Sequence, residues 1–114
     1  MPYIETKTTV KVSEAQEIRL KEKLGEAIAL IPGKSEEWLM LNLFDGCRMA
    51  FRAEREPDIA MVEIDIFGTT TDEAYDDLTK RVCEIINEEL GVPTDRIYVK
   101  YRECDRWGYD GFNF

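Results

Sequence analysis

The chain contains no histidine at all, and this absence removes several kinds of catalytic site. A Ser-His-Asp triad, a Cys-His pair and a histidine-ligated metal site all need an imidazole ring, so none of them can be present. Any acid–base chemistry must therefore use a carboxylate, a lysine, a tyrosine, a cysteine or the amino terminus. Long apolar runs are lacking too, since no segment approaches the ~20 apolar residues of a membrane-spanning helix.

Cysteine is scarce and follows no recognisable pattern. Cys47, Cys83 and Cys104 are an odd number of residues at wide spacings, and no C-x-x-C pair occurs. Cys83 is predicted to be a small residue on the apolar side of a helix, and the other two are predicted to be free thiols. Neither a metal site nor a redox site is expected from this arrangement.

Positive charge is in short supply. The chain has 24 acidic and 15 basic residues, which gives a formal net charge of −9. Most of its surface would repel a phosphate backbone, so a nucleic acid is not expected as a partner. A small anionic substrate would need a local cationic pocket. A membrane partner is not expected either.

The residues that are present suit one soluble domain spanning residues 1–114. At 44% hydrophobic the chain can form a core. No basic segment followed by an apolar run opens the chain, so no secretory signal is expected and the cytoplasm is the default location.

The first half of the chain reads as strand, helix, strand. Residues 2–8 alternate as a short strand, and Ser13 with Gln16 forms the S-x-x-Q pattern of a capping box. A Pro-Gly pair at 32–33 ends the helix, and residues 38–43 are predicted to form the next strand. The apolar face of the helix recurs at helical spacing and comprises Leu20, Leu24, Ala27, Ile28 and Ile31.

The second half repeats this plan. Residues 59–67 are predicted as a strand, and Thr70 with Glu73 as the start of a helix. Glycine and proline within 91–93 close that helix, and residues 97–102 form the last long strand. One strand face is predicted to hold Ala60, Val62, Ile64 and Ile66. The buried helix stripe is predicted to be Ala74, Leu78, Val82, Ile85, Ile86 and Leu90.

Two β-α-β units of similar length indicate a duplicated α+β domain. Right-handed crossovers would place both helices on one face of a four-stranded sheet. The other face would then be uncovered, which favours oligomerisation because its residues mix aromatic and charged types. That face is predicted to carry Met61, Glu63, Asp65, Phe67, Tyr98, Lys100 and Arg102.

The segment between the two halves has the sequence FDGCRMAFRAEREPD. Residues 49–51 are too few for a core strand but could pair at a sheet edge. Arg48, Arg52 and Arg55 concentrate positive charge there, and we interpret them as part of a solvated loop.

Pro2 directly follows the initiator methionine. A small second residue normally allows Met1 to be removed, which would leave Pro2 with a secondary amine whose pKa burial can move toward neutrality. If Met1 is retained, the nitrogen of Pro2 is a tertiary amide and is neither a base nor a nucleophile. Pro2 as a simple strand-start residue is the competing interpretation.

The chain resembles the tautomerase superfamily, specifically its macrophage migration inhibitory factor branch. The resemblance spans nearly the whole chain and implies a β-α-β-β-α-β protomer that assembles as a homotrimer, with active sites between neighbouring subunits. The matching pieces, in order, are Pro2 after Met1, Gly33-Lys34, Asp45, Met49-Ala50-Phe51, Glu56-Pro57, Gly68, Asp95-Arg96-Ile97-Tyr98, Gly108 with an adjacent aromatic, and Phe114.

The resemblance also implies roles for individual residues. Pro2 matches the catalytic proline, and Lys34 matches the lysine that pairs with a substrate carboxylate. Phe67 stands where the family has an aliphatic residue whose backbone contacts the ligand. Tyr98 matches a pocket tyrosine from the neighbouring subunit, and Lys100 replaces a ligand-contacting asparagine. Aromatic walls would be formed by Trp38, Tyr109 and Phe114.

The implied activity is keto–enol tautomerisation of phenylpyruvate-like α-keto acids, with Pro2 as general base and acid and with no cofactor or metal. The family's C-x-x-C is absent, so its thiol chemistry is not implied. Two alternatives stay open. One is a non-catalytic trimeric interaction protein of the same fold. The other is a different superfamily reaction, such as decarboxylation or hydrolytic dehalogenation.

Overall fold

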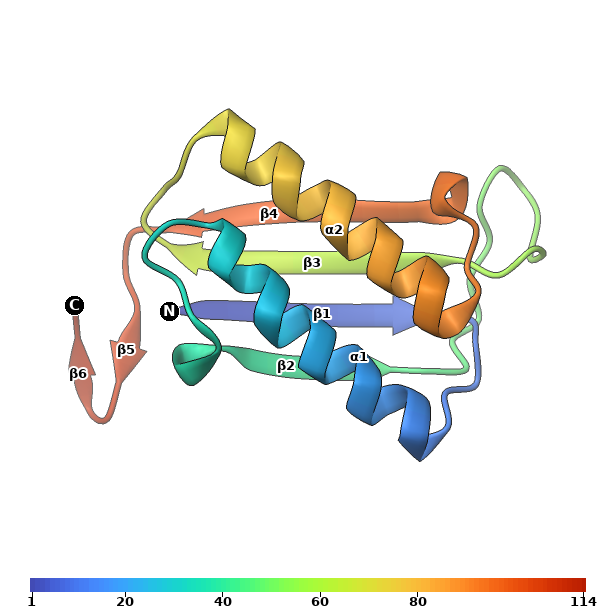
Figure 1. Cartoon of the computed structure of the whole chain (residues 1–114), viewed down its shortest axis with the longest axis horizontal. Coiled ribbons are helices and arrows are strands. Elements are labelled where there is room, and N and C mark those ends of the chain that lie inside the picture. The colour runs from blue at the N-terminus through green and yellow to red at the C-terminus, as the bar shows by residue number, and fades with distance from the viewer.

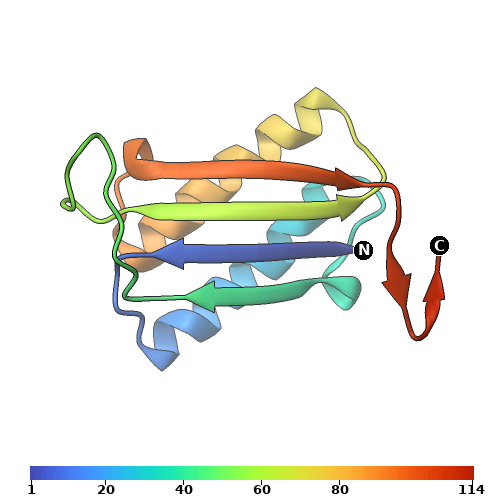
Figure 2. The ribbon, with the colours of Figure 1, turned by 180° about the vertical axis from the view of Figure 1, so that it is seen from behind.

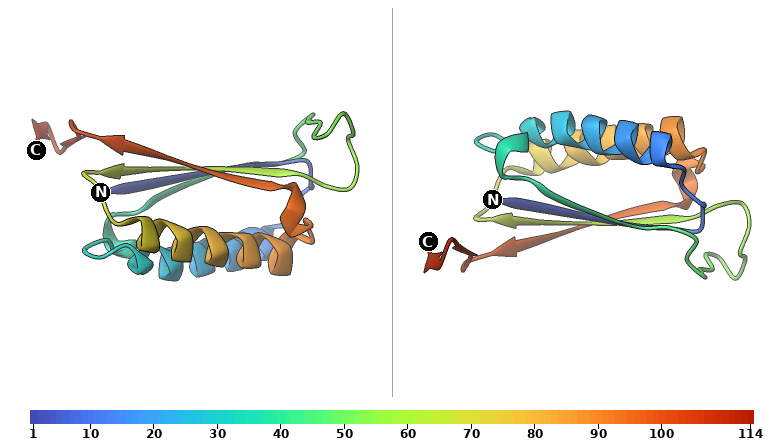
Figure 3. Two further views of the ribbon diagram at one scale, coloured as in Figure 1. Left: turned by 90° about the horizontal axis from the view of Figure 1, so that it is seen from above. Right: turned by 90° about the horizontal axis from the view of Figure 1, so that it is seen from below.

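The computed structural model covers residues 1–114 and shows two helices packed on one face of a four-stranded sheet (Figures 1 and 3). The element order β-α-β-β-α-β is the one predicted, followed by a small C-terminal hairpin. The sheet has the spatial order β2-β1-β3-β4 and consists of β1 (Pro2–Thr8), β2 (Met40–Phe44), β3 (Ala60–Phe67) and β4 (Ile97–Cys104).

Strand pairing divides the sheet into two equivalent halves. β1 and β2 are parallel, β3 and β4 are parallel, and the two halves meet through the antiparallel pair β1 and β3. Each parallel pair is connected through one helix, as a parallel connection requires. In the central pair Pro2 lies opposite Ile66, so β1 begins where β3 ends.

Helix α1 (Glu14–Ala27) begins at the predicted capping box but ends before the predicted stop at Pro32-Gly33, and a 3₁₀ turn at Ile28–Leu30 follows it. The Gln16 amide donates to Ser13 Oγ at 3.2 Å, and the Ser13 amide donates to Gln16 Oε1 at 2.9 Å. These two bonds satisfy amide groups that the first helical turn otherwise leaves without partners.

Helix α2 (Asp72–Leu90) begins one residue later than predicted. The cap is Thr71, whose Oγ1 accepts from the Ala74 amide at 3.1 Å, and the predicted cap at Thr70 is wrong. Adjacent threonines make the pattern ambiguous, because the cap oxygen must reach the amide three residues on. Gly91 ends the helix as predicted, with a left-handed φ of 73° that suits glycine.

The second strand also differs from its predicted bounds. Trp38 belongs to a 3₁₀ turn at Glu36–Trp38, closed by the Leu39 amide donating to the Glu36 carbonyl at 3.1 Å. The first residue of β2 is Met40, which pairs with Tyr3 near the start of β1. The strand therefore starts only where its partner is available, a condition that the local pattern does not contain.

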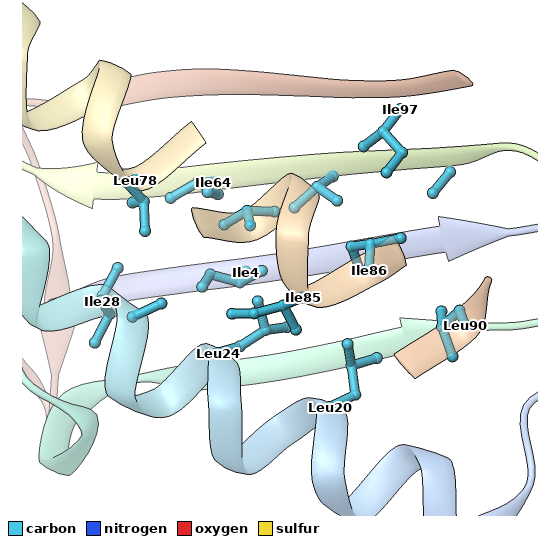
Figure 4. Close-up of a cluster of buried hydrophobic side chains, with 14 of the residues drawn as sticks. Ile4, Leu20, Leu24, Ile28, Ile64, Leu78, Ile85, Ile86, Leu90 and Ile97 are labelled. Atoms are coloured by element: carbon cyan, nitrogen blue, oxygen red, sulfur yellow. The ribbon is translucent and has the colours of Figure 1, made fainter. Parts of the chain in front are cut away.

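The core lies between the sheet and the two helices (Figure 4). Every residue predicted for the apolar faces of the two helices and of β3 is buried, including Ile64, Leu78 and Ile85 at 0% exposure. Burying an aliphatic side chain of this size contributes about 1.5–3 kcal/mol. Seventeen buried residues form one continuous cluster, which holds the two β-α-β halves together.

The other face of the sheet carries no helix, as predicted (Figure 2). We call it the open face. Its charged residues pair across strands: Lys100 Nζ lies 3.4 Å from Glu63 Oε1, and Arg102 Nη1 lies 3.9 Å from Asp65 Oδ2. Large apolar side chains on the open face are left to solvent in the single chain, namely Met40, Phe44 and Tyr98.

A loop extends from one end of the sheet and a hairpin from the other (Figures 2 and 3). The hairpin pairs β5 (Gly108–Tyr109) with β6 (Phe112–Asn113), near the end where β1 begins. In the loop, Phe51 forms an isolated bridge with Glu54, so the predicted edge segment pairs with no sheet strand of its own chain. Neither helix is long and apolar enough to cross a membrane.

The loop arginines and the three cysteines lie as the sequence predicts. Arg48, Arg52 and Arg55 are exposed, as a solvated loop predicts. The three cysteines are free and half-buried, and Cys83 packs against the core.

Candidate active site

Pro2 lies buried at the end of the sheet where β1 begins and β3 ends. The residue before it is also bound by the main chain, because the Phe67 amide donates to the Met1 carbonyl at 3.1 Å. Removal of Met1 would end that bond but would leave Pro2 paired with Ile66 in the sheet. Chemistry at Pro2 would therefore occur at a buried strand position rather than on a loose chain end.

Lys34 reaches this same end from the turn after α1. Gly33 has a φ of 83°, and the Lys34 amide donates to the Ile31 carbonyl at 3.0 Å, so a tight turn sends the chain back toward β1. The Lys34 ammonium donates to the Phe67 carbonyl at 2.9 Å. The main chain of Phe67 thus binds both the Met1 carbonyl and the Lys34 side chain.

The electrostatic effect of this arrangement falls on the terminal amine. Burial lowers the pKa of the Met1 α-amine below its usual value, and the positive charge and hydrogen bonding of Lys34 lower it further. Both effects disfavour the protonated form, because a buried cation loses hydration and is repelled by a neighbouring cation. This end of the sheet therefore favours a neutral amine.

A hollow of about 520 Å³ opens beside the amino terminus. The rings of Trp38 and Tyr109 meet edge to face with centroids 5.2 Å apart, so two of the predicted aromatic walls lie beside Pro2. The hollow is lined by Met1, Pro2, Tyr3, Glu37, Trp38, Met40, Asp65, Trp107, Gly108 and Tyr109.

Phe67 and Phe114 lie at the same end of the sheet but do not line the hollow. Their ring centroids are 5.8 Å apart, and the Phe114 amide donates to the Trp107 carbonyl at 3.0 Å. The contact fixes the C-terminal segment against the end of β3.

Lys34 is not among the residues that line the hollow, and neither are Tyr98 and Lys100. Tyr98 pairs in register with Met61 near the start of β3, and its ring packs on Phe51 at 5.1 Å. Lys100 pairs with Glu63 on the open face. Within one protomer, both are therefore separated from Pro2 along the length of the sheet.

Several residues that line the hollow were not predicted as site residues: Tyr3, Glu37, Met40, Asp65 and Trp107. Tyr3 and Asp65 are direct partners in the register of β1 and β3. The alternating pattern put Asp65 on the open face, but only the register brings it beside the amino terminus. No group of three or more acidic or thiol side chains is placed to hold a metal ion.

Comparison with known proteins agrees with the fold. The macrophage migration inhibitory factor (MIF) family matches residues 1–113. Macrophage migration inhibitory factor of Xenopus laevis is 24% identical, covering 100% of this chain and 99% of its own length. D-dopachrome decarboxylase of Bos taurus is 25% identical, covering 94% of this chain and 90% of its own.

A solved structure shows the same architecture. MIF2 of Leishmania major superposes with a TM-score of 0.92 at 26% identity, over 100% of this chain and 97% of that protein. The agreement includes the arrangement of two helices on a four-stranded mixed sheet. The chain belongs to the macrophage migration inhibitory factor family, within the tautomerase superfamily that its sequence resembles.

Proposed function

We propose that this protein is a keto–enol tautomerase that acts on phenylpyruvate-like α-keto acids. The observation that carries the proposal is the amino terminus, which lies beside Lys34 and opens into an aromatic hollow. Membership of the family and the relative named D-dopachrome decarboxylase support an isomerase of this kind.

The base in this proposal is the nitrogen of Pro2 after removal of Met1. Removal converts a tertiary amide into a secondary amine at a buried position. The causes that lower the pKa of the Met1 amine, burial and the charge of Lys34, would act on the Pro2 amine as well. A pKa lowered toward neutrality lets the amine accept a proton and then return it.

Binding would use charge at one end of the substrate and aromatic contact at the other. The Lys34 ammonium, held by the Phe67 carbonyl at 2.9 Å, would pair with the substrate carboxylate. The substrate ring would pack against the preformed wall that Trp38 and Tyr109 make by their edge-to-face contact.

The reaction moves one proton from carbon to oxygen or back. Neutral Pro2 would take the proton from the carbon next to the keto group, and the electron pair would move onto the keto oxygen. Protonated Pro2 would then deliver the proton to that oxygen and give the enol. The reverse sequence gives the keto acid, so atoms and charge balance without a cofactor.

The complete site is proposed to need a homotrimer. Tyr98 and Lys100 lie away from the hollow of their own chain, so they could reach a site only from a neighbouring subunit. Phe67 and Phe114 would flank the entrance from their own chain. The exposed apolar residues of the open face supply the surface for such an assembly.

The test is a phenylpyruvate ketonisation assay on the wild type and on Pro2→Gly, with intact masses measured for both. Pro2→Gly keeps a terminal amine but loses its secondary character, so turnover should fall by at least about tenfold while the circular dichroism spectrum stays the same. Equal turnover in two proteins that both lack Met1 would remove Pro2 from the mechanism.

A non-catalytic trimeric interaction protein is the second candidate. Phe112 and Phe114 on the C-terminal hairpin are 72% and 55% exposed, which suits contact with a partner. Retention of Met1 in the native protein, together with no turnover of α-keto acids, would favour this candidate. In that case Pro2 would carry no free amine.

A further inference from the structure

Asp65 is a carboxylate in the wall of the aromatic hollow. It projects on the open face, opposite Tyr3 in the register of β1 and β3. Its side chain is 21% exposed, and no hydrogen bond to its carboxylate is formed. A carboxylate that is mostly withdrawn from water and lacks donors is a strong acceptor for any ligand group that can donate to it.

The cation closest to Asp65 does not satisfy it. Arg102 Nη1 lies 3.9 Å from Asp65 Oδ2, which is beyond hydrogen-bond distance, and the Arg102 side chain is 59% exposed. Arg102 also lies 3.9 Å from Glu63, so its charge is shared between two carboxylates. An exposed, shared contact of this length is a weak one.

A second carboxylate and several rings share the hollow with Asp65. Glu37 lines it from the turn before β2 and is exposed. Aromatic faces attract cations, tryptophan most strongly, and aromatic walls combined with carboxylates are the usual way to bind an ammonium group. The aromatic lining consists of Tyr3, Trp38, Trp107 and Tyr109.

The two signs of charge lie on opposite sides of this end of the sheet, and only the carboxylates line the hollow itself. Lys34 comes from the turn after α1, on the helix side, and is held at the Phe67 carbonyl. Asp65 projects on the open face. A ligand spanning this end of the sheet would meet a cation at one side and carboxylates at the other.

We propose that Asp65 and Glu37 select substrates that carry an ammonium group at the end opposite their carboxylate. This inference rests on the proposed function and names the substrate class of the same site: aromatic α-keto acids with a cationic ring substituent. Asp65 accepts from the ammonium, Glu37 adds a second acceptor, and the aromatic walls surround the ring.

The test uses unreactive ligands, so that binding is separated from turnover. Titration calorimetry on the full chain compares para-aminomethyl phenylpropionate with para-ethyl phenylpropionate, which has a similar shape but no charge. The wild type should bind the aminomethyl compound about tenfold more tightly, the effect of a charge-assisted hydrogen bond in a partly buried site. Equal affinities would overturn the inference.

Two variants test which carboxylate causes the tighter binding of the aminomethyl compound. Asp65→Asn should remove most of the tenfold difference, and Glu37→Gln should reduce it by two- to threefold. Glu26→Gln is the matched control for loss of one negative charge, because Glu26 is exposed on α1 and lies outside the hollow. A preference retained in full by both Asp65→Asn and Glu37→Gln would overturn the inference. If Asp65→Asn does not fold, a full preference in Glu37→Gln alone would overturn it.

The outcome is distinguishable from failure of the proposed function. A protein that isomerises phenylpyruvate but binds both ligands equally would keep the proposed function and lose this inference. A protein that binds the aminomethyl compound through Asp65 but isomerises neither phenylpyruvate nor its para-aminomethyl derivative would keep the ligand preference and lose the tautomerase.

Discussion

Lys34 acts on the amino terminus through a contact that the main chain of Phe67 organises. The Phe67 amide donates to the Met1 carbonyl. The Phe67 carbonyl accepts from the Lys34 ammonium at 2.9 Å. The lysine is therefore kept near the terminal amine without a carboxylate that would neutralise it. Its positive charge remains available both to lower an amine pKa and to bind an anion.

Replacement of Lys34 by alanine tests both effects. We expect Lys34→Ala to raise the apparent KM for phenylpyruvate and to raise the pKa of the Pro2 amine. The base works in its neutral form, so a higher pKa moves the ascending limb of the pH–rate profile to higher pH, by less than about one unit. The measurement is kcat/KM between pH 5 and 9 for both proteins.

Lys100 should matter less than Lys34. It pairs with Glu63 on the open face, so part of its charge is already compensated. We expect Lys100→Asn to change kcat/KM by less than about threefold, in either direction, because such an exposed pair contributes little. Loss of activity in Lys100→Asn, with an unchanged pH profile in Lys34→Ala, would place the substrate carboxylate at Lys100 instead.

At the scale of elements, the start of α2 offers a paired test. Thr71 caps the helix through the Ala74 amide at 3.1 Å, whereas Thr70 caps nothing. Thr71→Ala should lower the free energy of unfolding by about 1 kcal/mol per chain, and Thr70→Ala should leave it nearly unchanged. Urea denaturation at one fixed protein concentration measures both. If Thr70→Ala lowered the free energy of unfolding more than Thr71→Ala, Thr70 would be the cap instead.

Tyr75 on α2 contacts Glu103 on β4, and the pKa of its hydroxyl is raised. Burial, followed by a hydrogen bond to Glu103, raises the pKa of Tyr75 from 10.0 to about 12. The folded state thus holds this proton more tightly than the unfolded state. The stability that follows is present below pH 10 and is lost as the pH rises through 12.

Ultraviolet titration of tyrosinate should therefore show one tyrosine ionising near pH 12. Glu103→Gln should lower that pKa only in part, because burial is the larger cause and remains. Burial raises the pKa of Tyr101 as well, so the Tyr75→Phe protein should lose one tyrosine from the late part of the titration and keep the other. A late phase of unchanged amplitude in Tyr75→Phe would assign it to another tyrosine.

The whole molecule leaves one sheet face uncovered, and we propose that subunits assemble through this face. We expect a homotrimer with a mass of about 40 kDa, three times the 13.3 kDa of one chain. Sedimentation velocity at micromolar concentration measures it. Tyr98→Asp, on the open face, should weaken the assembly, whereas Ile18→Asp, on the exposed side of α1, should not. A wild-type monomer would contradict this prediction.

Local sequence pattern determined most of the fold. Apolar residues at periods of two and 3.6 identified the buried faces of β3, α1 and α2, and all of those residues are buried. Ser13 with Gln16 and Gly91 marked helix ends correctly, because caps depend only on residues three or four apart. The resemblance to a family then placed Pro2 and Lys34 together, and the parallel pairing of β1 and β2 brings them to one end.

Tertiary structure alone decided which side chains meet at the hollow. The start of β2 at Met40 depends on where β1 begins, so Trp38 became part of a turn rather than a strand. Asp65 reaches the amino terminus only because the register of β1 and β3 sets it opposite Tyr3. Register is a property of two strands far apart in the chain, and a shift of one residue would turn Asp65 to the core.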